Sequence, residues 1–71
     1  MAKGKNIELK LLRVRHGLTQ EEAAAACGFS RTQWGAVENG DQHGSRRFWK
    51  AVQDRFQVSD ADMWKIMNGG A

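Results

Sequence analysis

A chain of 71 residues, 41% of them apolar, can bury one modest core, which is enough for a single domain and too little for a typical catalytic one. Its one cysteine, Cys27, excludes an internal disulfide. The apolar runs are too short to cross a bilayer. We therefore expect one cytoplasmic domain over residues 1–71, with no membrane contact, no enzymatic activity, no cofactor and no metal site.

The net charge of +3 is concentrated in two segments. Residues 1–16 carry five basic side chains against Glu8, and residues 45–50 add three more. These side chains are Lys3, Lys5, Lys10, Arg13, Arg15, Arg46, Arg47 and Lys50. The last third of the chain is slightly acidic. A polyanion would therefore meet one part of the molecule, although charge alone equally fits a solvated surface.

The segment 7–16 places leucines and basic residues at helical spacing and ends at Gly17, which predicts a first helix. Thr19 begins a second helix, because its hydroxyl can cap the helix start while Glu22, three residues later, reaches back to complete a capping box. Four consecutive alanines, which are good helix formers, continue this helix to Cys27. Their small side chains let another helix approach closely.

Ser30, Ser45 and Ser59 each precede a segment with apolar residues at helical spacing, and they predict the N-caps of three more helices. Trp34 gives the third helix an inward edge, and we expect its ring in the core rather than stacked on a base. A polar loop over residues 41–44 follows this helix. The prediction is an all-α chain of five helices without an internal repeat.

Three motifs inside this pattern carry more specific information. They are Leu18–Ala24 (LTQEEAA), Gly28–Arg31 (GFSR) and Val37–Gly40 (VENG). In this order and spacing they resemble the Cro/CI-type phage repressor family, over residues 9–67. The resemblance implies a compact five-helix, lambda-repressor-like DNA-binding domain. Its parts are a flexible basic start at 1–5, a helix-turn-helix at 19–39 with positioning helix 20–27 and recognition helix 30–39, and a tail at 68–71.

The sequence departs from the family pattern at a few positions. Trp34 replaces a branched aliphatic residue, and the small Ala23 and Cys27 replace bulkier ones, so we expect compensating core volume. Gln57 stands where the family commonly has glycine, which leaves the end of the fourth helix open.

The resemblance implies that the recognition helix reads base edges in the major groove. The residues concerned are Arg31, Thr32, Gln33, Gly35 and Ala36. Arginine suits the paired acceptors of guanine, and threonine offers a hydroxyl or a methyl group. Other roles stay open, because Arg31 also suits a phosphate and Gln33 a solvated surface. Gly35 either allows close approach to DNA or merely weakens the helix.

The same resemblance implies a set of phosphate contacts around this helix. The set is Gln20, Ser30, Asn39, Arg46, Arg47 and Lys50. Gln20 would also brace the recognition helix, and Asn39 equally suits the turn with Gly40. Arg13 and Glu38 match a pair that the family uses to hold the first helix to the end of the third. We expect this ion pair to be structural.

We expect a homodimer, because the family binds near-palindromic operators as dimers with half-sites about 34 Å apart. The candidates for the dimer contact are Trp64, Met67, Met63 and Val58. Their apolar pattern fits the core equally well, and for Val58 the core is favoured. The implied function is sequence-specific binding of double-stranded DNA as a transcriptional regulator. We expect a Cro-like or CI-like repressor in a bacterial cell or prophage, associated with the nucleoid. The alternative is an antitoxin or adaptor whose main partner is a protein.

Overall fold

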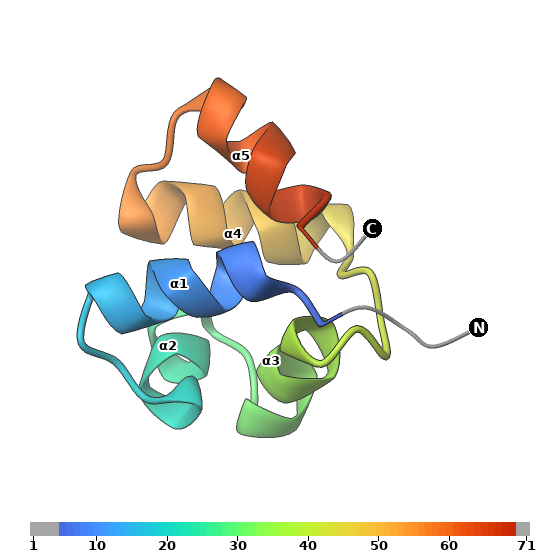
Figure 1. The fold of residues 1–71 in the computed structure, drawn as a ribbon. Helices are drawn as coiled ribbons and strands as arrows, with labels where there is room; N and C mark the ends of the chain where they lie inside the picture. The colour runs from blue at the N-terminus through green and yellow to red at the C-terminus, as the bar shows by residue number, and fades with distance from the viewer. Residues whose placement is uncertain (1–4, 70–71) are drawn as a thin grey trace.

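The computed structural model describes residues 5–69, and within them it contains five helices and no strand (Figure 1). In chain order they are α1 (Ile7–Arg15), α2 (Gln20–Cys27), α3 (Arg31–Glu38), α4 (Arg46–Phe56) and α5 (Asp60–Met67). The all-α, five-helix prediction is confirmed. The predicted basic start and tail fall partly outside the described residues, at 1–4 and 70–71. None of the helices within the described range is long and apolar enough to cross a membrane.

Every one of these helices begins at a side chain that accepts a hydrogen bond from the backbone N–H three residues further on. These N-caps are Asn6, Thr19, Ser30, Ser45 and Ser59. Each satisfies a free N–H group at a helix start, which contributes about 1 kcal/mol to the stability of the fold. At Thr19 the predicted capping box is present. Its Oγ1 accepts from the Glu22 N–H at 3.1 Å, and its own N–H donates to Glu22 Oε1 at 2.9 Å.

Two helix ends depend on left-handed backbone. α2 ends at Gly28, where φ is 80°, a conformation that glycine adopts without steric cost. α4 ends at Gln57, where φ is 52°, which costs a residue with a Cβ roughly 1 kcal/mol. The end of the fourth helix, left open by the sequence, is therefore made by glutamine in a conformation typical of glycine.

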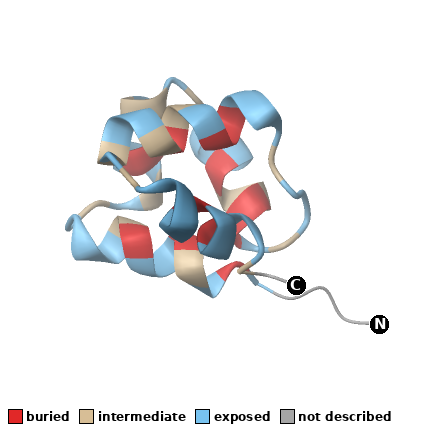
Figure 2. Ribbon diagram, turned by 90° about the horizontal axis from the view of Figure 1, so that it is seen from above, coloured by how far each residue is buried: buried red, intermediate tan, exposed pale blue. Residues whose placement is uncertain are grey.

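α2 and α3 lie together at one end of the molecule and α5 at the other, with α1 and α4 between them (Figure 1). All five helices contribute buried positions, which face inward from each of them (Figure 2). The apolar core consists of Leu9, Leu12, Ala23, Ala24, Trp34, Val37, Phe48, Trp49, Val52, Met63 and Ile66. Burial of each of the larger side chains contributes roughly 1.5–3 kcal/mol.

Trp34 has the largest fully buried side chain, so its predicted place in the core is confirmed. Its ring centroid lies 5.5 Å from that of Phe48, which in turn lies 5.2 Å from Phe29 and 5.0 Å from Trp49. Inclined aromatic pairs contribute about 0.5–1.5 kcal/mol beyond simple burial. Because the two buried alanines of α2 are small, the aromatic rings supply much of the core volume.

The loop between α3 and α4 packs tightly on Trp49. The indole N–H of Trp49 donates to the His43 carbonyl at 2.8 Å. Gly44 has a φ of 81°, and a Cβ added there would lie 2.8 Å from Trp49 Nε1. Glycine is therefore required at this position both by the backbone conformation and by the indole beside it.

We expect Gly44→Ala to destabilise the fold more than the matched variant Gly17→Ala. Gly17 also has a positive φ, 69°, but an added Cβ meets nothing within 4 Å, so it carries only the backbone cost of about 1 kcal/mol. Gly44→Ala adds a clash with a buried ring, for which a further loss of roughly 1–3 kcal/mol is typical. Urea unfolding of both variants measures the difference, and equal losses would contradict this packing.

Candidate nucleic-acid interface

The turn between α2 and α3 fixes the angle at which α3 leaves α2. Gly28 reverses the chain in the left-handed conformation, and the Phe29 N–H donates back to the Ala24 carbonyl at 2.8 Å. The half-buried Phe29 ring packs on Phe48 of α4. Ser30 then caps α3, as predicted. The turn is thus held by backbone, ring and cap together.

The start of α3 presents its side chains outward. Arg31, Thr32 and Gln33 are exposed, and within residues 5–69 the side chains of Arg31 and Thr32 have no hydrogen-bonding partner. Trp34 and Val37 on the same helix are buried. α3 is therefore anchored by one face and leaves two of the proposed base-reading side chains free to bind a ligand.

Gln33 is partly occupied by the fold. Its Oε1 accepts from the Ser30 N–H at 2.9 Å, while Ser30 Oγ accepts from the Gln33 N–H at 3.1 Å. This second capping box was not predicted, although serine followed three residues later by glutamine is its signature. The amide NH₂ of Gln33 is the group that remains for a partner.

Gly35 and Ala36 are half-buried on α3. A Cβ added at Gly35 would meet only Gln20 Oε1, at an ordinary contact distance of 3.9 Å. Packing within the described chain therefore does not require glycine at this position. The close approach of Gly35 to DNA therefore stays a prediction, and so does the alternative that this glycine merely weakens the helix.

The carboxylate of Glu38, at the end of α3, is the most heavily bonded side chain of the interface. Arg13 of α1 binds it in a bidentate pair, Nε to Oε2 and Nη2 to Oε1, each at 3.0 Å. The indole N–H of Trp34 donates to the same Oε2 at 2.7 Å. Arg13 also donates to the Leu18 carbonyl at 2.9 Å. The side chains of Arg13 and Glu38 are only 13% and 6% exposed, so water competes little for these bonds.

Gln20 of α2 adds a further hydrogen bond to Glu38, so α1, α2 and α3 meet at one carboxylate. Burial by itself raises the pKa of Glu38, but hydrogen bonds from Arg13 and Trp34, the charge of Arg13 and the bond from Gln20 outweigh it. The pKa of Glu38 therefore lies below its ordinary value of 4.5. The sequence did not reveal the bond from Trp34, although its i,i+4 spacing to Glu38 permits it.

The other proposed phosphate-binding residues lie at the end of α3 and at the start of α4. Asn39 is exposed at the C-cap of α3, and Arg46, Arg47 and Lys50 are exposed along the first turns of α4. Lys50 Nζ lies 4.0 Å from Asp54, an exposed pair that contributes at most about 1 kcal/mol. All of these basic groups are accessible to a phosphate backbone.

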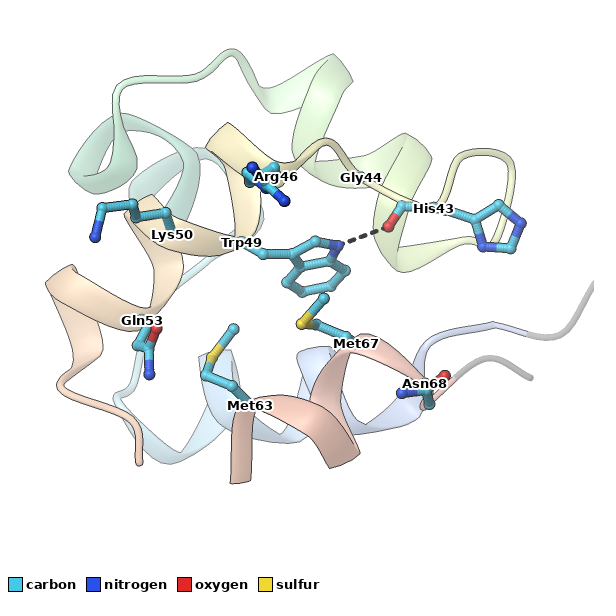
Figure 3. A pocket seen from close by; sticks show the side chains of 9 residues that line it. All are labelled: His43, Gly44, Arg46, Trp49, Lys50, Gln53, Met63, Met67 and Asn68. Atoms are coloured by element: carbon cyan, nitrogen blue, oxygen red, sulfur yellow. Dashed lines mark hydrogen bonds between the residues drawn. The ribbon is translucent and has the colours of Figure 1, made fainter. Parts of the chain in front are cut away.

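Four of the proposed DNA contacts line surface pockets, two of them in each of two separate pockets. Gln20 and Arg31 line a shallow pocket together with Arg13, Thr19 and Glu21. Arg46 and Lys50 line a different groove of about 530 Å³ between α4 and α5. In that groove the side chains of Met63 and Met67 project from α5 toward Trp49 (Figure 3).

The structure divides the four proposed dimer residues. Trp64 is 71% exposed and Met67 46% exposed. Met63 is only 5% exposed and belongs to the core, so it offers little surface to the predicted dimer contact. The reason is helical spacing, because Met63 and Ile66 share the inward face of α5 while Trp64 points away. Val58 is half-buried against the core.

The geometry described so far is a positioning helix, a glycine turn and an outward-facing second helix. A family model described as a helix-turn-helix domain matches residues 7–69. The chain belongs to the helix-turn-helix domain family. No curated protein and no solved structure gives a significant match. A helix-turn-helix domain is a DNA-binding domain. In this protein α2 and α3 are the two helices of the motif.

Cys27, at the end of α2 in this helix-turn-helix domain, is half-buried against the core. Burial raises the pKa of its thiol, and the charge of Arg55 opposes that change only in part. The thiol is therefore protonated at neutral pH and is a poor nucleophile.

We expect the Arg13–Glu38 pair to give a strongly non-additive double-mutant cycle. Arg13→Ala and Glu38→Ala each leave a charged partner in a poorly hydrated place, at a cost of about 3 kcal/mol. The double variant removes both charges, so its loss of unfolding free energy should be smaller than the sum of the losses in the two single variants. Chemical unfolding of the four proteins measures the coupling, and simple additivity would count against the pair as a structural unit.

The lowered pKa of Glu38 also predicts a pH dependence. A carboxyl group whose pKa is lower in the folded state stabilises the fold above its unfolded pKa, and this contribution is lost as the pH falls through the folded value. Glu38→Gln should therefore be less stable than wild type at pH 7, and the gap should narrow below about pH 4.5. Thermal unfolding of both proteins across this pH range tests the prediction. A stability difference that does not change with pH would contradict the lowered pKa of Glu38.

Proposed function

We propose that the protein is a transcriptional regulator that recognises a specific sequence in double-stranded DNA. The exposed start of α3 carries this proposal, because Arg31 and Thr32 are held outward on a helix whose other face is buried. The guanidinium of Arg31 can donate to both major-groove acceptors of a guanine, and Thr32 can contact a neighbouring base. These two residues supply sequence information, while Gln33 contributes its remaining amide group.

Binding to the phosphate backbone orients α3 in the groove. Arg46, Arg47 and Lys50 supply positive charge, and Asn39 and Ser30 supply polar groups near the two ends of α3. Contacts of this kind fix the register of a protein on DNA without reading its sequence. Gln20, which is bonded to Glu38, couples the start of α2 to this surface.

Two copies bound side by side contact a longer stretch of DNA than one copy can. The domain measures 32 × 26 × 22 Å, which is close to the spacing of about 34 Å between successive major grooves on one face of DNA. A two-fold dimer therefore fits a palindromic site with one α3 in each half-site. The resemblance to Cro/CI-type repressors favours repression by occupation of such an operator.

Selection of bound sequences from random duplexes tests this function. We expect the selected sequence to be palindromic. Arg31→Ala should weaken binding to it by about 1–3 kcal/mol and relax the base preference at one position in each half-site. Arg47→Ala is the matched control, since loss of a phosphate contact weakens binding to all sequences and lowers the salt slope by about one. Absence of any enriched sequence would contradict the proposal.

A further inference from the structure

The fold holds the side-chain amide of Gln33 in one orientation. Its Oε1 accepts from the backbone N–H of Ser30 at 2.9 Å, and Ser30 Oγ accepts from the backbone N–H of Gln33 at 3.1 Å. The oxygen of the amide, and not its nitrogen, must face Ser30, because a backbone N–H group can only donate. The NH₂ group is therefore the half of the amide that is left for a second molecule.

This orientation removes the pattern with which glutamine reads adenine. In that contact the amide oxygen accepts from the N6 amino group of adenine while the amide NH₂ donates to N7. With Oε1 turned towards the backbone of Ser30, the two amide atoms do not face one base edge together. Gln33 is left as a donor, which fits either an acceptor on a base, such as guanine O6, or a phosphate oxygen.

The place of Gln33 on α3 favours the phosphate. Trp34 and Val37 are buried, and helical periodicity puts Thr32 and Ala36 on the opposite line of the helix. Gln33 lies to the side of that line, about a quarter of a turn from Thr32. An α-helix with its side chains is about 10–12 Å wide and nearly fills a major groove about 12 Å wide. Side chains on its flanks therefore meet the sugar-phosphate walls of the groove.

The surroundings of Gln33 are compatible with a phosphate. Gly35 lies on the other flank of α3, where an added Cβ would be 3.9 Å from Gln20 Oε1 of α2, so Gln33 is directed away from α2. The first turn of α3 contains no acidic residue, whereas the first turns of α1, α2 and α5 do. No carboxylate of this turn would therefore repel a phosphate beside Gln33.

We propose that Gln33 donates its amide NH₂ to a DNA phosphate, which fixes the register of α3 in the groove, and that it does not read a base. The inference rests on the proposed recognition of DNA by α3 and assigns a role within it. The sequence preference of α3 then comes from Arg31 at its start and from the outward line of Thr32 and Ala36.

Two substitutions at Gln33 separate the phosphate contact from the capping box. Gln33→Glu keeps an oxygen for the Ser30 N–H, since serine followed three residues later by glutamate is a capping-box pattern, but it replaces the NH₂ donor by a negative charge. Gln33→Ala removes both the cap and the donor. Thermal unfolding should therefore show Gln33→Glu to be the more stable of the two variants.

Binding to a selected duplex should rank the two variants in the opposite order. Gln33→Ala should bind at least about tenfold more weakly than wild type, because a hydrogen bond to a charged group is lost. Gln33→Glu should bind more weakly still, because its carboxylate faces the phosphate. If Gln33 acted only by capping α3, the more stable variant would also bind better, and that result would overturn the proposal.

Selection from random duplexes distinguishes a phosphate from a base as the partner of Gln33. Both Gln33 variants should select the same sequence as wild type, while the control Arg31→Ala relaxes the preference. A methylphosphonate, which replaces a charged phosphate oxygen by a methyl group, should weaken wild type at one backbone position for each bound copy and have no further effect on Gln33→Ala.

Two further outcomes would overturn the assignment of Gln33. One is a changed base preference in either Gln33 variant, for example a gain of cytosine in Gln33→Glu, because a carboxylate accepts from the cytosine amino group. The other is wild-type affinity in both variants. A wild type that binds DNA without selecting a sequence would contradict the proposed function instead, and the comparison of the Gln33 variants on any duplex would still test the phosphate contact.

Discussion

One buried carboxylate holds the end of the proposed recognition helix, α3, in place. Glu38 accepts hydrogen bonds from Arg13 of α1 and Trp34 of α3, and Gln20 of α2 bonds to it as well. A charge removed from water is costly unless its lone pairs are satisfied, so this geometry tolerates little rearrangement. Three helices of a small domain are thereby held at one point. Together with the Gly28 turn, this contact fixes the orientation of α3.

This rigidity has a functional consequence at the other end of α3. Base recognition requires side chains held to within a fraction of an ångström, and a fixed helix provides this better than a mobile loop. Arg31 and Thr32 are exposed on the first turn, while the last turn ends in the buried Glu38. The proposed reading surface is therefore supported from inside the protein and remains accessible from outside.

Local chemistry allowed much of the fold to be predicted. The hydroxyl caps at Thr19, Ser30, Ser45 and Ser59 mark helix starts because each satisfies a free N–H within its own turn. Which side chains are buried, and which of them bond to each other, was harder to predict. Met63 and Trp64 are adjacent and both apolar, and only the packing of α5 decides that the first is core and the second exposed. Likewise the Trp34 bond to Glu38 depends on the rotamers of two buried side chains, which sequence spacing permits without specifying.

Mapping backbone amide shifts by NMR while a selected duplex is added reports directly which helices meet DNA. We expect the largest changes at Gln20, at Arg31 to Gln33 and over the first turn of α4, with α5 unchanged except where dimer formation affects it. Shifts concentrated on other surfaces, with the start of α3 unaffected, would contradict the assignment of α3 as the recognition helix.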